Sequence, residues 1–170
     1  MSNSKKEGIK FEHELISSFN KVPYTSVYKP PDTPGITNGK MSFTPKRPFD
    51  MFVCHRGISI AIEAKKTSCV TSFPFGNQAV LKPHQIGYLY THYVSWGPSF
   101  VFVNFRNDEM CRAAAVPISF IIDNLKTLKY KYIFDTFQEI PRDHNLWNVE
   151  HFLNSCVKEV TCKWAEYGDA

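Results

Sequence analysis

The stretch PFDMFVCHRGISIAIEAK, residues 48–65, decides the fold. It holds two apolar runs, 49–54 and 58–65, separated by the short polar segment His55-Arg56-Gly57, a pattern typical of two strands joined by a tight turn. Side chains along a strand alternate between its two faces. We therefore expect Phe49, Met51 and Val53 to share one face, with Asp50 on the other. In the second strand, one face carries Ile58, Ile60, Ile62 and Ala64, and the opposite face carries Glu63 and Lys65.

The length of the turn predicts the register of the pair. A two-residue turn at Arg56-Gly57 pairs His55 with Ile58 and hence sets Asp50 opposite Glu63. Directly opposed residues have Cβ atoms about 4.5–5.5 Å apart. Two carboxylates that close repel each other unless a cation lies between them.

Carboxylate oxygens are the ligands of Mg²⁺ and Mn²⁺, which usually take one or two protein carboxylates together with water and substrate phosphate. Lys65 lies one pleat from Glu63 on the same face, where its ammonium can serve an attacking water and offset charge on a phosphate. The pattern thus favours metal-dependent phosphodiester hydrolysis. The alternative is an exposed strand face with a salt bridge from Asp50 to Lys65.

Glu12 is a candidate third ligand. It falls within a predicted helix at 4–20, on the stripe of Ile9, Ile16 and Phe19. A carboxylate that faces the core is costly unless it is paired or bound to metal. The alternative is that Glu12 lies at the edge of this stripe and reaches water.

The remaining pattern predicts an α/β fold in which a central mixed sheet is flanked by helices. Further strands are expected at 24–29, 99–105 and 111–117, and further helices at 82–95, 118–128 and 147–164. The aromatic side chains of 88–96 are expected to be mostly core rather than a base-stacking surface. Residues 29–48 read as a mobile, basic, Pro- and Gly-rich arm, and 130–170 as a C-terminal extension without an assigned role.

Composition and charge narrow the class of protein. The chain has 170 residues, which suggests one domain. It lacks an apolar run long enough to span a membrane, and its charged start is unlike a signal peptide, so we expect a cytoplasmic protein with reduced cysteines. Residues 1–72 hold 11 Lys and Arg against 6 Asp and Glu, whereas the rest is slightly acidic. A basic half favours an anionic partner such as nucleic acid.

Three short motifs then carry a family resemblance: Glu63-Ala64-Lys65-Lys66-Thr67, Thr71-Ser72-Phe73-Pro74 and His84-Gln85-Ile86. Together they resemble the RecU-type Holliday junction resolvases, which belong to the PD-(D/E)xK, or restriction-endonuclease-like, nucleases. The resemblance also takes in Gly8, Phe11-Glu12, Asp50 and the strand at 99–105, and it spans 8–122.

The resemblance implies a role for each matching residue. Asp50 and Glu63 correspond to metal-binding acids, Glu12 to the acid that completes their site, Lys65 to the catalytic lysine, and Gln85 to a glutamine that faces the active centre. Thr71 and Ser72 correspond to a phosphate-contacting loop; without the family, a simple turn and a surface helix are the preferred interpretations of these segments. The remaining DNA-contact candidates are Lys10, Lys40, Lys46, Arg47, Lys66 and Thr67.

The resemblance also implies a homodimer that resolves four-way DNA junctions in recombination and repair, with Mg²⁺ or Mn²⁺ as cofactor. The arm at 29–48 is shorter than the stalk of this family, and the small size suits a phage-encoded version that works beside host recombination proteins in a bacterial cell. Two alternatives remain: a nuclease of the same fold that acts on forked, branched or duplex DNA, and a catalytically silent architectural DNA-binding protein.

Overall fold

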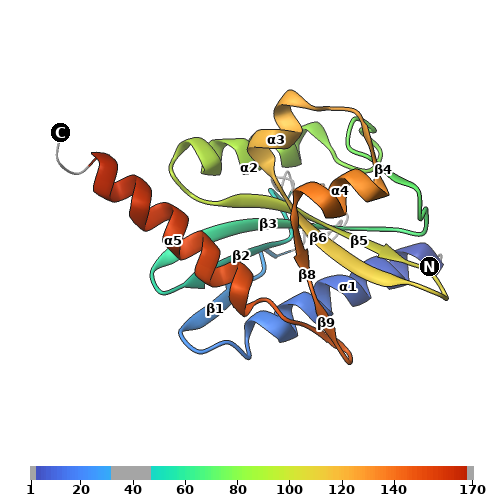
Figure 1. Cartoon of the computed structure of the whole chain (residues 1–170), viewed down its shortest axis with the longest axis horizontal. Coiled ribbons are helices and arrows are strands. Elements are labelled where there is room, and N and C mark those ends of the chain that lie inside the picture. Colours follow the sequence, from blue (N-terminus) through green and yellow to red (C-terminus); the bar gives the residue numbers. More distant parts are fainter. Residues whose placement is uncertain (1–2, 32–46, 168–170) are drawn as a thin grey trace, which may run out of the picture.

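The computed structural model describes residues 3–31 and 47–167, and a mixed sheet of six strands forms its centre (Figure 1). Lys40 and Lys46, like most of the predicted arm, lie outside the described residues. The strand order is β1-β2-β3-β5-β6-β8, and only β3 and β5 run parallel. The strands are β1 (Thr25–Tyr28), β2 (Met51–His55), β3 (Ile58–Thr67), β5 (Ser99–Arg106), β6 (Cys111–Pro117) and β8 (Gln138–Ile140).

Helices cover both faces of this sheet, as predicted (Figure 1). One face packs against α1 (Asn3–Phe19) and α5 (Glu150–Tyr167), through a core that includes Phe11, Leu15 and Phe152. The other packs against α2 (Pro83–Val94), α3 (Ile118–Asp123) and α4 (Tyr130–Thr136). Two small pairs complete the fold: β4 (Ser72–Pro74) with β7 (Thr127–Lys129), and β9 (Arg142–Asp143) with β10 (Leu146–Trp147). Within the described ranges, no helix is long and apolar enough to cross a membrane.

The tight turn between β2 and β3 has the backbone that a two-residue hairpin requires. Arg56 and Gly57 both have positive φ, at 50° and 83°. Two such residues in succession give a turn whose twist matches that of the flanking strands. The strands pair His55 with Ile58 and Met51 with Ile62, which confirms the predicted register.

Three predictions about these elements need correction. Phe49 is buried on the α2 side, away from Met51 and Val53, because β2 begins only at Met51 and the alternation does not reach back to residue 49. The helix predicted over 118–128 ends at Asp123, because Leu128 is buried where β7 pairs with β4. Residues 130–167 are part of the main body, since they supply the edge strand β8 and the covering helix α5.

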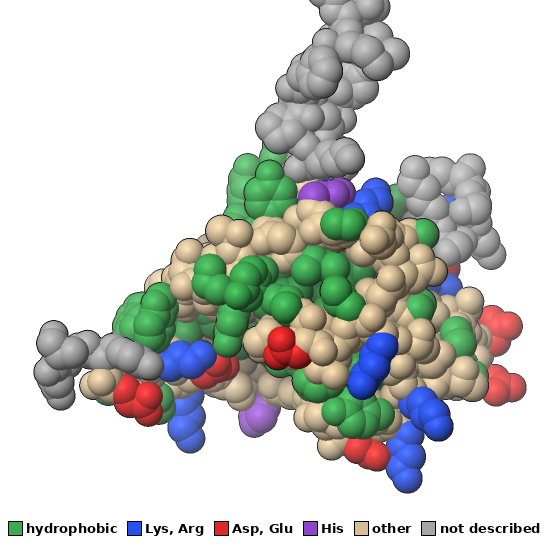
Figure 2. Space-filling model, turned by 90° about the horizontal axis from the view of Figure 1, so that it is seen from above, with side chains coloured by type: hydrophobic (Ala, Val, Ile, Leu, Met, Phe, Trp, Pro, Cys, Tyr) green, Lys and Arg blue, Asp and Glu red, His purple; other side chains and the backbone are tan. Residues whose placement is uncertain are grey.

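Most of the aromatic residues after Gln85 lie at the surface, contrary to expectation, although Tyr93 is partly buried and packs against the core. Only Leu89 of α2 is buried, whereas Tyr88, Tyr90 and Trp96 are 45–47% exposed. Figure 2 shows hydrophobic side chains gathered on the outer surface of the layer that α2, α3 and α4 form. The helix α2 packs against β3, β5 and α3, and its remaining surface is open to solvent.

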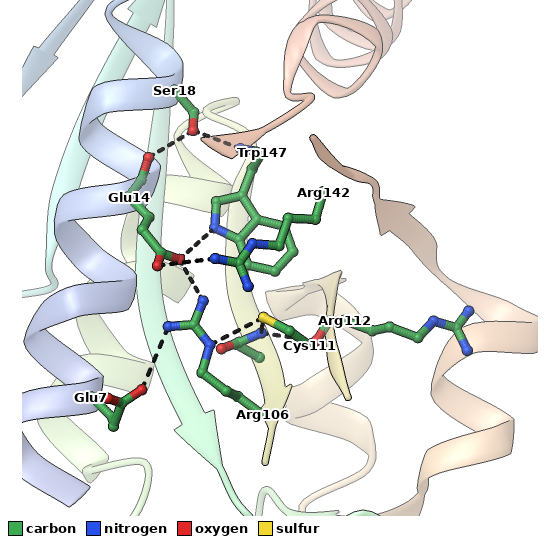
Figure 3. A network of polar contacts seen from close by, with 9 residues as sticks. Glu7, Glu14, Ser18, Arg106, Cys111, Arg112, Arg142 and Trp147 are labelled. Carbon is green, nitrogen blue, oxygen red and sulfur yellow. Dashed lines mark hydrogen bonds and ion pairs between the residues drawn. The ribbon is translucent and has the colours of Figure 1, made fainter. Parts of the chain in front are cut away.

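A buried polar network ties α1 to the far strands of the fold (Figure 3). The carboxylate of Glu14 lies 2.5 Å from Nη2 of Arg106 and 3.5 Å from Nη2 of Arg142, and it accepts a hydrogen bond from Nε1 of Trp147 at 3.2 Å. Ser18 Oγ donates to the Glu14 carbonyl and accepts from the Trp147 amide. The buried acid of α1 is thus Glu14, and its charge is balanced by two arginines.

Replacing Glu14 by Gln keeps the size of the side chain but removes the charge that balances Arg106. Because breaking a buried ion pair leaves an uncompensated charge in the interior, we expect the free energy of unfolding to fall by about 3 kcal/mol, measured by urea unfolding. Glu159→Gln is the control: it breaks the exposed pair with Lys163 and should cost less than about 0.5 kcal/mol. Equal losses in the two variants would contradict the structural role of the network.

Candidate active site

The two central carboxylates meet at the open end of the β2–β3 hairpin. Asp50 directly precedes β2 and follows in register from the pair Met51–Ile62, which sets it beside Glu63. Its Oδ2 atom accepts a hydrogen bond from the backbone amide of Ala64 at 2.8 Å. Both acids are buried, with Asp50 4% and Glu63 0% exposed. This burial contradicts the alternative interpretation of an exposed strand face.

Lys65 and Gln85 both contact Glu63. Nζ of Lys65 lies 2.6 Å from Oε1 of Glu63, and Nε2 of Gln85 donates to the same oxygen. Oε1 of Gln85 accepts from Nζ of Lys65 at 3.4 Å and from the amide of Lys82 at 3.1 Å. The first turn of α2 therefore holds Gln85 over β3, where its two ends contact the lysine and the acid.

Glu12 reaches the same region through a cation. Oε2 of Glu12 accepts a hydrogen bond from Nζ of Lys29 at 2.9 Å and lies 3.7 Å from Nη2 of Arg47. The same Arg47 nitrogen donates to Oδ1 of Asp50. Glu12 is thus neither a core acid nor free in water: it is an ion-paired group at the edge of the helix, linked to Asp50 by Arg47.

The protonation of the buried pair follows from this geometry. Burial, and after it the charge of Asp50, raise the pKa of Glu63 to about 8, although the nearby Lys65 acts in the opposite direction. Burial also raises the pKa of Asp50, with Glu12 adding to the effect. Two acids with raised pKa values ionise together only when extra positive charge arrives. A bound cation would therefore stabilise the ionised forms of both carboxylates.

The predicted phosphate-contacting residues Thr71 and Ser72 contact Cys69, which precedes them in the same turn. The Thr71 and Ser72 hydroxyls lie 3.3 and 3.9 Å from Sγ of Cys69. Hydrogen bonds from the Thr71 hydroxyl, from the backbone amides of both residues and from the Ser72 hydroxyl lower the pKa of that exposed thiol to about 7. Thr67 Oγ1 accepts from the Cys69 amide at 3.0 Å. Thr67 therefore shapes the turn, and Cys69 is a group that the sequence analysis missed although the close Thr and Ser spacing signals it.

Lys10 and Lys66 lie apart from the carboxylates. Alternation along β3 turns Lys66 to the α1 side of the sheet, opposite to Lys65. There, Lys10 and Lys66 line a cavity of about 620 Å³ together with Arg106 and Arg142, and with the acids Glu7, Asp108 and Glu109. The structure thus gives the two lysines a shared surface of their own.

No three His, Cys, Asp or Glu side chains converge as a ligand set within residues 3–31 and 47–167. Arg47 lies between Glu12 and Asp50, so the predicted trio is not assembled as three ligands of one ion. The pair Asp50 and Glu63 is the part of the predicted metal site that the structure brings together.

The raised pKa of Glu63 gives a testable pH dependence. A carboxyl whose folded pKa is about 8 and whose unfolded pKa is 4.5 binds its proton more tightly in the folded state. It therefore stabilises the fold below pH 4.5, and this contribution is lost as the pH rises toward 8. Without divalent ions, the stability of Glu63→Gln should gain on that of the wild type over this interval, in chemical unfolding at several pH values. A constant difference would contradict the shift.

One known protein family matches most of the chain. The family model described as RecU: Recombination protein U matches residues 8–149. The match covers well over half of the 170 residues and reaches beyond the 8–122 of the motif resemblance, to the residue before α5. No curated protein matches the chain.

Proposed function

The chain belongs to the RecU, or recombination protein U, family, and from this membership we propose that it is a divalent-metal-dependent endonuclease that resolves four-way DNA junctions. The observation that carries the proposal is the buried pair Asp50 and Glu63, with Lys65 and Gln85 in contact with Glu63. An architectural protein would have no need for two buried acids whose ionisation is opposed by burial.

The donor set fits Mg²⁺ or Mn²⁺. Oε2 of Glu63 is buried, and no hydrogen-bond partner for it exists among the described residues. An unsatisfied carboxylate oxygen in the interior is costly, and a hard cation with oxygen ligands would satisfy it. Asp50 and Glu63 would hold the ion. Once bound, it would supply an acidified water and neutralise charge on the scissile phosphate.

The neighbouring side chains have roles that their contacts support. Lys65 keeps its ammonium at the carboxylate of Glu63, where it can donate a hydrogen bond to the attacking water or to a phosphate oxygen. Gln85 contacts both side chains at once and so helps to hold Lys65 beside Glu63. Glu12 acts from further out, by adding negative charge that favours cation binding at Asp50.

A homodimer is the assembly that the proposed substrate requires. A four-way junction presents two equivalent strands, and a two-fold axis between two chains would give each strand its own active site. Paired nicks placed symmetrically about the junction are the expected product.

The first experiment is cleavage of a labelled four-way junction in Mg²⁺ or Mn²⁺, beside forked and duplex DNA of the same sequence. We expect symmetric paired nicks in the junction, and at least about a 100-fold loss of rate in Asp50→Asn and Glu63→Gln. Equal cutting of all three substrates would keep the nuclease and reject junction selectivity. Tight junction binding without cleavage would favour the architectural alternative.

The two lysines that line the cavity beside α1, Lys10 and Lys66, have a separate expected effect on DNA binding. If Lys10 and Lys66 contact backbone phosphates, replacing both by Gln should weaken binding to junctions of any sequence and reduce the slope of log affinity against log salt by about 2. Fluorescence anisotropy at several salt concentrations measures both. The control removes two exposed lysines elsewhere, Lys131 on α4 and Lys158 on α5, and should leave the slope unchanged. The same change in both double variants would mean that only net charge matters.

A further inference from the structure

Each of the three acids around the proposed site is paired with a cation of the same chain. Lys29 contacts Glu12, Arg47 contacts Asp50, and Lys65 contacts Glu63. When all three carboxylates are ionised, their negative charge equals the positive charge of these three cations, counted over the described residues alone. A divalent cation that binds one of these carboxylates therefore competes with the cation already paired with it. Its binding is most favourable if the resident cation moves away from the oxygen that the divalent cation binds.

Asp50 is the acid at which a resident cation and a divalent cation would compete for the same oxygen. Its Oδ2 atom is engaged by the amide of Ala64, which β3 holds within the sheet. Its other oxygen, Oδ1, accepts from the guanidinium of Arg47. Glu63 differs, because its Oε2 atom has no hydrogen-bond partner among the described residues. A cation between the two acids thus finds one open oxygen on Glu63 and an occupied oxygen on Asp50.

From these contacts we propose that Arg47 is a positioning residue that occupies Oδ1 of Asp50 as an internal counter-ion and must yield that oxygen when a divalent cation binds. The inference rests on the proposed metal site and adds to it a residue outside the acids. Arg47 is suited to the role because a single atom, Nη2, contacts Oδ1 of Asp50 and also lies 3.7 Å from Oε2 of Glu12. It balances two acids in the metal-free protein, and its charge opposes the entry of the ion.

Lys29 provides a matched control for this role. It neutralises the same cluster and lies 2.9 Å from Glu12. Its ion pair is with Glu12, and among the described residues it forms none with Asp50 or Glu63. Removing Lys29 therefore takes away one positive charge from the cluster without freeing Oδ1 of Asp50. A comparison of the two cations separates competition for one oxygen from a general charge effect.

The test is a titration of the full chain with Mn²⁺ in the absence of DNA, with free Mn²⁺ followed by electron paramagnetic resonance. We expect Arg47→Gln to bind Mn²⁺ about tenfold more tightly than the wild type. Lys29→Gln should stay within about twofold of the wild type. Arg47→Met is a second neutral variant, expected to give the same gain. Circular dichroism and thermal unfolding verify that each variant is folded.

A double-mutant cycle locates the effect at Asp50. In an Asp50→Asn background, where the contested carboxylate is gone, Arg47→Gln should no longer tighten binding. Unchanged or weaker binding in both Arg47 variants would overturn the inference, and so would an equal gain in Lys29→Gln. If the wild type binds Mn²⁺ and the Arg47 variants behave like it, the proposed function survives without this residue. If neither wild type nor variants bind Mn²⁺, the metal site itself is rejected.

Discussion

The register of the β2–β3 hairpin is the constraint on which both the core and the candidate site depend. Because side chains alternate along a strand, a slip of one residue would move Ile58, Ile60 and Ile62 out of the core and turn Glu63 to the opposite face. The turn at Arg56 and Gly57, with two positive φ angles, prevents that slip. The hydrogen bond from the Ala64 amide to Asp50 then closes the other end of the hairpin. One pairing thus builds a hydrophobic face and brings two acids together.

Two buried acids show how the same kind of group can serve stability or chemistry. Glu14 has partners on both of its carboxylate oxygens, and these partners join α1 to distant strands. Glu63 is buried as deeply, yet Oε2 has no hydrogen-bond partner within the described chain. A satisfied acid is a structural element, whereas a partly unsatisfied one stores a preference for a ligand. This contrast is the physical reason to look for a cation at Glu63 and not at Glu14.

The sequence pattern was least informative about partners that come from elsewhere in the chain. On α1 it pointed to Glu12 as the acid nearest the core, but the buried acid is Glu14, because Arg106 and Arg142 balance it from strands far along the chain. The prediction that Gln85 faces the active centre rested on family resemblance alone, since no spacing rule links an α2 side chain to β3. Its hydrogen bond to Glu63 is seen only in the structure. The roles of these site residues stay predictions, although the structure brings Asp50, Glu63, Lys65 and Gln85 together.

By itself, the sequence determined the α/β class, the strands on either side of the turn, and the register that sets Asp50 beside Glu63, because alternation and turn length are local properties. It also carried the motifs of the family to which the chain belongs. Only the tertiary structure decided that Arg47 contacts Asp50 and that Lys66 faces away from Lys65, into the cavity that it lines with Lys10. It also decided that residues 130–167 complete the sheet and cover one of its faces. These outcomes depend on which segments contact one another in the folded chain. Burial and charge balance across the whole molecule decide which of these contacts form, and spacing along the chain does not.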